Sequence, residues 1–195
     1  LKENKIVIAG GQESMSKAPH AIFYREEKKF SEDKLIDTMI HDGLIDAFNN
    51  YHMGVTAENV AEKYNISRKE QDLFALESQE KTQKAIDGNK FKEEIIAFEI
   101  IKNDKADIFK KDEYPNENLD IKTLNSLKTV FKNNGTVTAG NSSGLNDGAA
   151  ALVLMSQEEA DLRKIESLAK IVSWATCGVE PSLMGLGPIP ATNLA

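Results

Sequence analysis

The sequence predicts an α/β fold, and three apolar segments near its two ends indicate it. Lys5–Gly11 is a short continuous apolar run closed by two glycines, which is typical of a buried strand. Ala149–Met155 is a second such run, and Gln157–Ala160 begins a surface helix after it. Leu168–Ala175 is a third apolar run. Two strands joined through a helix form a βαβ-type unit, so we expect α/β structure in the last part of the chain.

The middle of the chain carries helix signals. Thr56–Tyr64 has the spacing of a short amphipathic helix. Ser67–Glu70 reads Ser-Arg-Lys-Glu, a capping box in which the serine hydroxyl accepts an orphan backbone N–H and the glutamate reaches back to the serine. We therefore expect a second helix to begin here and to end at Gly88, since glycine commonly follows a helix.

Weaker signals follow this helix. Phe91–Ile101 predicts a strand, Lys102–Asn118 a polar loop, and Leu124–Phe131 a short mixed segment. Earlier in the chain, the charges of Arg25–Lys29 alternate in sign, which indicates solvated surface or an oligomer contact.

Both ends are expected to be cut. The chain begins without an initiator methionine, a few residues before an apolar strand signal. It stops at Pro190–Ala195, where Thr192 or Asn193 has the character of a helix cap.

Composition limits the class of protein. The 195 residues can bury a sizeable core, as one large domain or two small ones. A net charge of −7 argues against a nucleic-acid partner. The sequence has no signal peptide and no apolar run long enough to span a membrane, so we expect a cytoplasmic protein without a membrane partner.

The single cysteine, Cys177, excludes an internal disulfide and a cysteine-built metal site. No helix start or adjacent base surrounds it, so we expect a small apolar packing residue rather than a nucleophile. The carboxylates of Asp37, Asp42 and Asp46 are too irregularly spaced to predict a metal site.

Residues 135–150 form the most informative block. It contains four glycines, three alanines and four serine or threonine hydroxyls. Small residues let backbone approach a ligand closely, and the hydroxyls and backbone groups suit a ligand rich in amides or phosphates. From the residues alone, a tight buried turn between a loop and a strand is the favoured interpretation.

The amino-acid sequences of five blocks together favour a ligand-binding segment over a purely structural turn. They occur in the order Ala9–His20, Met39–Phe48, Tyr51–Asn59, Gly135–Ala150 and Gly185–Ala191. In this order and spacing they resemble the thiolases over essentially the whole chain. The resemblance implies part of a five-layered α/β/α/β/α fold with an inserted loop domain. Residues 1–14 would end the N-terminal half, residues 15–147 would form the CoA-binding loop domain, and residues 148–195 would begin the C-terminal half.

The resemblance also implies an activity. Thiolases condense two acetyl-CoA molecules to acetoacetyl-CoA and CoA, and catalyse the reverse thiolysis, as dimers or tetramers. Coenzyme A thioesters are substrates, and no cofactor or metal is expected. The nucleophilic cysteine would precede Leu1, and the catalytic histidine, the second cysteine and the asparagine motif would follow Ala195. No catalytic residue is therefore expected within this chain.

The resemblance assigns binding residues at both ends of the substrate. His52 would lie near the pantetheine, and Met53 and Met184 would border the acyl group. Ala139, Ser142 and Ser143 would contact the pantetheine arm, and Thr123 and Leu127 the adenine end. His20 and His41 match family motifs outside the catalytic set and are expected to be structural.

Alternatives stay open at these positions. A lone His52 beside aromatic residues is more often structural, and Ser142–Ser143 has the character of a helix cap before Leu145. Asn116 stands where many thiolases carry an arginine that contacts the nucleotide, and asparagine lacks that charge. Three functions are consistent with the sequence: part of an active thiolase, a truncated CoA-binding product, and a non-catalytic oligomerising domain.

Overall fold

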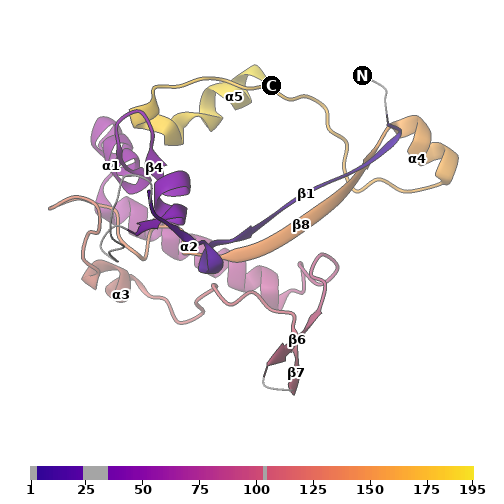
Figure 1. The fold of residues 1–195 in the computed structure, drawn as a ribbon, viewed down its shortest axis with the longest axis horizontal. Helices are drawn as coiled ribbons and strands as arrows, with labels where there is room; N and C mark the ends of the chain where they lie inside the picture. Colours follow the sequence, from indigo (N-terminus) through magenta and orange to yellow (C-terminus); the bar gives the residue numbers. More distant parts are fainter. Residues whose placement is uncertain (1–3, 24–34, 103–104) are drawn as a thin grey trace. The chain divides into compact units, whose positions relative to one another are not determined.

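The protein is described here by a computed structural model, which covers residues 4–23, 35–102 and 105–195 (Figure 1). The chain divides into two compact units. The terminal unit comprises Leu1–Thr56 and Leu145–Ala195, and the central unit comprises Ala57–Gly144. The predicted charge cluster at residues 25–29 lies outside the described residues.

A long two-stranded ribbon dominates the terminal unit. β1 (Ile6–Ser14) pairs antiparallel with β8 (Asp147–Met155), as the labels in Figure 1 show. Both predicted strands are confirmed, but their predicted burial is wrong: Ile8 is 76% exposed and Val153 62% exposed. Two strands alone cover neither face of their own ribbon, so apolar side chains stay open to solvent.

The predicted βαβ unit is wrong in its second half. The helix is confirmed as α4 (Gln157–Arg163), which Ser156 caps by accepting a hydrogen bond from the Glu159 N–H at 3.2 Å. Residues 168–175, however, form no regular element, and Trp174 is 82% exposed. A strand needs a neighbour to satisfy its backbone, and among the described residues β8 pairs with β1 and not with residues 168–175.

The chain closes on two short helices, η5 (Pro181–Leu186) and α5 (Pro188–Leu194). The predicted cap at Thr192 or Asn193 is wrong, because α5 already begins at Pro188, and proline suits a first turn whose N–H groups have no helical partner. The predicted packing role of Cys177 is also wrong: the thiol lies in the irregular stretch before η5 and is exposed.

Short elements carry the chain from β1 to the first long helix. They are η1 (Met15–Lys17), β2 (His20–Ala21), β3 (Ile36–Asp37), η4 (Met39–Leu44, a π-helix), β4 (Ile45–Asp46) and β5 (Tyr51–His52). β2 pairs with β3 and β4 pairs with β5, both antiparallel. Asp147 at the start of β8 accepts hydrogen bonds from the backbone and hydroxyl of Ser16, which lower the pKa of this carboxyl group.

Two helices organise the central unit. α1 (Met53–Tyr64) leads in from the terminal unit, and α2 (Arg68–Asp87) follows. The predicted capping box is confirmed: the Glu70 N–H donates to the Ser67 hydroxyl at 3.3 Å, and the Ser67 N–H donates to the Glu70 carboxylate at 2.7 Å. The expected end at Gly88 is confirmed as well.

The next prediction was only partly right. The strand predicted from Phe91 begins later, as β6 (Phe98–Lys102), because the Ile95 N–H donates to the Phe91 carbonyl and keeps that stretch in a turn. The predicted polar loop contains β7 (Lys105–Phe109), which pairs antiparallel with β6. The stretch around it, residues 102–118, is mostly polar and gives no clear strand signal, so cross-strand pairing decides its conformation.

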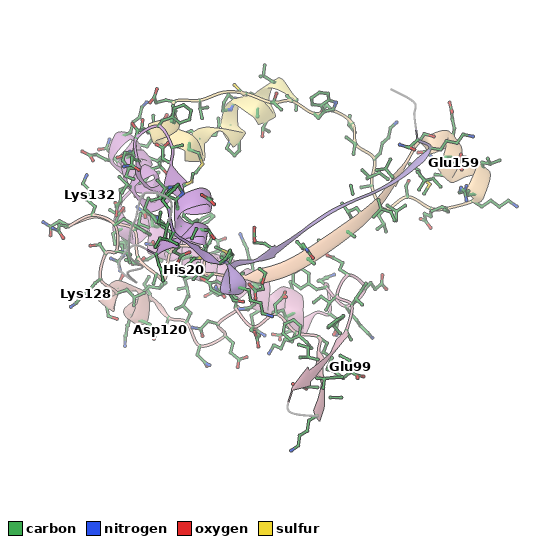
Figure 2. The ribbon with its side chains drawn as sticks, viewed as in Figure 1. His20, Glu99, Asp120, Lys128, Lys132 and Glu159 are labelled. Carbon is green, nitrogen blue, oxygen red and sulfur yellow. The ribbon has the colours of Figure 1, made fainter. Side chains whose placement is uncertain are left out.

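α3 (Ile121–Ser126) completes the set of helices in the central unit. Asp120 caps it by accepting the Thr123 N–H at 2.7 Å, and Figure 2 shows Asp120 beside this helix. Leu124 on α3 is fully buried, and α3 packs against α2. This contact places α3 beside the glycine-rich block that carries much of the candidate site.

Candidate functional site

The start of the glycine-rich block is held by a buried carboxylate on α1. Glu58 is 3% exposed. It accepts the Val137 N–H at 2.8 Å, the Thr136 N–H at 2.8 and 2.9 Å, and the Thr136 hydroxyl at 2.9 Å. A Cβ on Gly135 would collide with this same carboxylate. Glycine is therefore required where the backbone passes Glu58.

The next turn of the block is held from within by Asn141. Its side-chain oxygen accepts the Thr138 N–H at 2.8 Å, and its amide group donates to the Thr136 carbonyl at 3.0 Å. The Thr138 hydroxyl accepts the Gly140 N–H at 3.2 Å. Several backbone groups of the loop, which were expected to contact a ligand, therefore form hydrogen bonds within the loop. Ligand contacts from this loop would come mainly from its exposed side chains.

α3 lies directly against this loop. A Cβ on Gly140 would stand 2.5 Å from Leu124 Cδ2 and 2.6 Å from Leu127 Cδ1. Only a glycine allows that approach without displacing a neighbour. Leu127 and the loop, which the sequence assigned to different ends of the substrate, are thereby neighbours.

The end of α3 and the loop of residues 136–143 together form a surface, called here the joined surface. The five predicted binding residues of the central unit lie on it. Thr123 is exposed on α3, and Leu127 is half-buried at its end. Ala139 and Ser143 are exposed on the loop. Ser142 is half-buried, and its hydroxyl donates to the Thr138 carbonyl at 2.7 Å.

The helix-cap alternative for Ser142–Ser143 is wrong. No helix follows these serines: residues 143–146 are irregular, and β8 begins at Asp147. The Ser142 hydroxyl instead stabilises the loop internally, while its oxygen keeps the capacity to accept a hydrogen bond.

Three predicted residues belong to the terminal unit, and a tight hairpin places the first two. β4 and β5 set Ile45 opposite His52 and Asp46 opposite Tyr51. Asp46 holds the turn by accepting the Phe48 N–H at 2.9 Å and the Asn49 side-chain amide at 2.6 Å. These hydrogen bonds, that from the Asn49 amide foremost, lower the pKa of Asp46, so its carboxylate is ionised at neutral pH.

The His52 ring has a defined orientation. Its Nδ1 accepts the Gly54 N–H at 2.9 Å. A nitrogen that accepts a backbone N–H carries no proton of its own, so neutral His52 has its proton on Nε2. The half-buried ring is therefore anchored at Nδ1. Met53 follows at once, as the first residue of α1.

Met184, the third of these residues, lies on η5 and is 42% exposed. Its carbonyl accepts the Gly187 N–H at 3.0 Å, which tightens the turn before α5. Gly187 alone separates η5 from α5, and the prolines Pro188 and Pro190 belong to α5.

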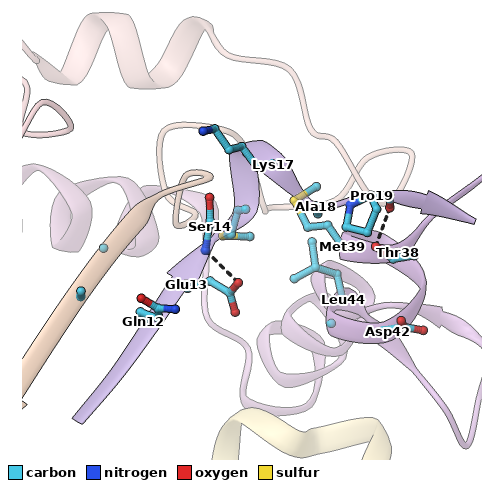
Figure 3. Close-up of a pocket in the computed structure, with 14 residues that line it drawn as sticks. Gln12, Glu13, Ser14, Lys17, Ala18, Pro19, Thr38, Met39, Asp42 and Leu44 are labelled. Carbon is cyan, nitrogen blue, oxygen red and sulfur yellow. Dashed lines mark hydrogen bonds between the residues drawn. The ribbon is translucent and has the colours of Figure 1, made fainter. Parts of the chain in front are cut away.

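Each unit contains a cavity. A cavity of about 740 Å³ in the terminal unit is lined by Glu13, Lys17, Met39, Asp42, Leu44 and neighbouring residues, and by none of the eight predicted binding residues (Figure 3). A cavity of about 610 Å³ in the central unit is lined by Ser142 and Ser143 together with Phe74, Gln79 and Tyr114. Asn116 is exposed, and its N–H donates to Gln79 Oε1 at 3.0 Å.

Sequence reasoning missed the residues whose hydrogen bonds fix the backbone of the loop and the end of α3. In the sequence, Glu58, Arg68 and Asp72 are polar positions within the expected helices, and Asn141 lies within the glycine-rich block. A charged pair at positions i and i+4 of one helix, Arg68 and Asp72, was the available signal. Among the described residues, no group of histidine, cysteine or carboxylate side chains has the arrangement of a metal site, and no helix can cross a membrane.

Comparison with known proteins identifies the family. The family described as thiolase, N-terminal domain, matches residues 1–158. The chain belongs to the thiolase family. This thiolase chain is 52% identical to an acetyl-CoA acetyltransferase of Rhizobium meliloti over 192 residues, which are 98% of the chain and 49% of that protein. The chain thus spans about half the length of the curated relatives it matches.

Solved thiolases share the fold. The acetyl-CoA acetyltransferase of Bacillus anthracis is 41% identical and superposes with a TM-score of 0.91 over 97% of this chain and 48% of its own. Human mitochondrial 3-ketoacyl-CoA thiolase is 36% identical and superposes with a TM-score of 0.91 over 100% of this chain and 49% of its own. The predicted α/β thiolase fold is confirmed.

Proposed function

We propose that the complete polypeptide containing this thiolase chain is an acetyl-CoA C-acetyltransferase. It condenses two acetyl-CoA molecules to acetoacetyl-CoA and CoA, and catalyses the reverse thiolysis. One observation carries the proposal: the 52% identity, over 98% of the chain, to a relative named acetyl-CoA acetyltransferase. The chain is acidic overall, and nothing in the proposal requires a nucleic acid, a membrane, a metal or a cofactor.

Within that enzyme, this chain supplies binding rather than bond chemistry. The pantetheine arm carries two amides that need partners when they are buried. The exposed hydroxyl of Ser143 is a suitable partner, and Ala139 is exposed on the same loop. His52 would lie near the pantetheine arm, as the family resemblance implies. The nucleotide end would lie over Thr123 and Leu127, and Met53 and Met184 would border the acyl group. The catalytic cysteines and histidine would come from other parts of the polypeptide.

The choice of acetyl over longer acyl groups comes from the relatives' names. The fold itself does not select the chain length, since a solved acetyl-CoA acetyltransferase and a solved 3-ketoacyl-CoA thiolase superpose equally well on this chain. Met53 and Met184 have flexible side chains, so a pocket that they border is compatible with a small acyl group.

A second candidate applies to a polypeptide limited to these residues. It would bind CoA, or associate with further subunits, without turnover. This follows because the family resemblance places the nucleophilic cysteine before Leu1. The described hydrogen bond of the single thiol, Cys177, is to the Gly178 carbonyl and not to a base. For the complete enzyme we propose a cytoplasmic homodimer or homotetramer, which sedimentation velocity would distinguish from a monomer.

The direct test is acetoacetyl-CoA thiolysis by the purified polypeptide, with its intact mass determined in the same sample. Turnover by a species about twice the chain's mass of 21.6 kDa would support the proposed enzyme. A 21.6 kDa species that binds CoA by calorimetry without turnover would support the second candidate. A complete polypeptide that neither turns over nor binds CoA would contradict both.

A pair of variants tests the role of the loop. Ser143→Ala removes only a hydroxyl, and Ser143→Leu adds bulk at the same place. We expect a modest rise in the KM for CoA with alanine and a large one with leucine, because the leucine side chain would fill the path of the pantetheine. An equal, negligible effect of both variants would remove Ser143 from the binding surface.

A further inference from the structure

One buried carboxylate connects the two segments that form the joined surface of the central unit. Asp72 on α2 is fully buried, and both of its side-chain oxygens are bonded. Its Oδ2 accepts the Arg68 Nε–H at 2.7 Å, and its Oδ1 accepts the Asn141 side-chain amide at 3.0 Å. A buried charge of this kind is stable only when it is paired and hydrogen-bonded.

The arginine side leads to α3. Arg68 Nη2 donates to the Leu124 carbonyl at 2.5 Å and to the Leu127 carbonyl at 3.1 Å. These carbonyls lie at the C-terminal end of α3, where the Leu124 carbonyl also accepts the Leu127 N–H at 3.1 Å. One guanidinium thus bonds Asp72 with one nitrogen and the end of α3 with another, which the single ammonium of a lysine cannot reproduce.

The asparagine side leads to the loop. Asn141 shares its amide group between Asp72 and the Thr136 carbonyl, and its oxygen accepts the Thr138 N–H. The same side chain therefore fixes the turn that presents Ala139 and fixes its distance from α2. Loop and helix α3 meet at Gly140, where an added Cβ would displace Leu124 or Leu127.

We infer that Asp72 is a positioning residue that sets the spacing between the two CoA-contacting segments, the end of α3 and the loop of residues 136–143. The inference rests on the proposed function, because CoA is the ligand whose nucleotide end and pantetheine arm are assigned to these two segments. Asp72 itself is buried and touches no ligand. It determines how far the site for the nucleotide end lies from the site for the pantetheine arm.

Glu58 provides a contrast within the same unit. It bonds Thr136 and Val137 but makes no described hydrogen bond to α3. Loss of Glu58 would loosen the loop alone, whereas loss of Asp72 would uncouple the loop from α3. The two carboxylates therefore predict different patterns of disturbance.

The test uses the complete polypeptide with Asp72→Asn, Glu58→Gln and, as a surface control on α2, Glu77→Gln. Amide hydrogen exchange is followed in residues 124–127 and 136–141. We expect faster exchange in both segments for Asp72→Asn, in residues 136–138 alone for Glu58→Gln, and no change for Glu77→Gln. Faster exchange in only one segment of Asp72→Asn would overturn the inference, whether or not the protein binds CoA.

Calorimetry with two probes supplies the functional readout. Loss of a hydrogen bond to a charged group corresponds to about a tenfold change in an equilibrium, so we expect the Kd for CoA to rise about tenfold in Asp72→Asn. Adenosine 3′,5′-bisphosphate lacks the pantetheine arm and would use only the contacts proposed at Thr123 and Leu127, so its Kd should change by less than about twofold. Equal weakening of both probes, or an unchanged Kd for CoA, would contradict a positioning role.

Two further outcomes are separable. A wild-type protein that binds neither probe would sink the proposed function, and the exchange pattern would still decide whether Asp72 couples the segments. If Asp72→Asn does not fold, Asn141→Ala removes only the loop side of the connection and keeps the Arg68 pair. It should weaken CoA binding and speed exchange in the loop while residues 124–127 stay protected, and protection of both segments would count against the inference.

Discussion

At the scale of single residues, a buried position and a half-buried one decide whether the glycine-rich loop keeps its shape. Glu58 satisfies backbone donors that face away from solvent, and Gly140 admits the two leucines of the α3 end. Neither position carries chemistry. Both residues hold the backbone of the loop in place on the side that faces the helices. Ala139 and Ser143 keep their positions only while that backbone is held.

Replacing the Glu58 carboxylate tests the first position. In Glu58→Gln an amide NH₂ would face backbone N–H groups that need an acceptor, so we expect the free energy of unfolding to fall by about 2–3 kcal/mol in urea titrations. Glu62→Gln on the same helix is the matched control, since Glu62 is exposed and pairs only with exposed Lys132. A loss as large for Glu62→Gln would show that helix α1, and not the buried carboxylate, responds to the change.

Adding one methyl group tests the second position. In Gly140→Ala the new Cβ would lie about where Leu124 and Leu127 already stand, and such overpacking costs about 1–3 kcal/mol. Thermal unfolding followed by circular dichroism measures the loss. Gly43→Ala is the control, because a Cβ there meets no heavy atom within 4 Å, and it should leave the melting temperature nearly unchanged.

At the scale of elements, the predicted ends of α2 are confirmed, because a helix cap depends only on residues close together in sequence. The box at Ser67 and Glu70 is local: its partners lie three residues apart, so the sequence alone determines it. The ends of α2 and the start of α4 were predictable for the same reason. β7 and the irregular stretch of residues 168–175 were not, because a strand depends on a partner elsewhere in the chain or on its absence.

Removing the cap should therefore be costly. Ser67→Ala leaves the Glu70 N–H without its acceptor, and we expect a loss of about 1 kcal/mol in the free energy of unfolding. Ser78→Ala, in the interior of the same helix, replaces serine by a better helix former and should not destabilise the protein. Equal destabilisation by both substitutions in urea titrations would argue against the capping box as the cause.

The cap of α3 should respond to pH. The Thr123 backbone N–H lowers the pKa of Asp120 below its ordinary value of 3.8 in the folded protein. The ionised cap therefore stabilises the fold above about pH 4, and this contribution disappears as the pH falls through the lowered pKa. Asp120→Asn cannot titrate, so wild type should be the more stable protein at pH 6 and should lose that advantage near pH 2.

Urea titrations of both proteins between pH 2 and pH 7 measure the difference. An advantage of wild type that stays constant over this range would show that the Asp120 carboxyl group does not titrate differently in the folded and unfolded states.

The candidate site shows a similar limit of sequence reasoning. Family resemblance named surface residues such as Thr123 and Ser143, because such residues recur in recognisable motifs. The residues that hold them, Glu58, Asp72 and Asn141, are far apart in sequence and become a group only when α1, α2 and the loop are folded. A buried carboxylate looks like any helix-surface carboxylate until its neighbours are known.

At the scale of the whole molecule, the two units differ in how completely they cover their apolar residues. In the central unit, Leu124 and Val137 are buried beside bonded carboxylates. In the terminal unit, the ribbon of β1 and β8 and the stretch after α4 keep large apolar side chains open, among them Ile8, Leu152, Val172 and Trp174. Contiguous exposed apolar surface of this kind marks a place for a packing partner or a tendency to aggregate.

This difference predicts the behaviour of a polypeptide restricted to these 195 residues. We expect it to bind an apolar fluorescent dye and to associate as its concentration rises, and we expect the complete polypeptide to bind much less dye. Dye fluorescence and sedimentation velocity measure both properties. Replacing Ile8 and Val153 by threonine should reduce association while the strands persist, and a dye-free monomer of the unmodified 195 residues would refute the expectation.

The pairing of β1 with β8 also bears on the order in which the chain acquires structure. Ser16 meets Asp147 across 131 positions of sequence, whereas the central unit is one unbroken segment lying between them. Contacts between distant positions form slowly, because a long flexible loop must close before any pairing compensates for the lost chain entropy. On a ribosome, Ala57–Gly144 has emerged before β8 exists, so it can fold first and shorten the loop that β1 must close. The folded central unit would then reduce the chain entropy lost when β1 pairs with β8, and would favour that pairing during synthesis.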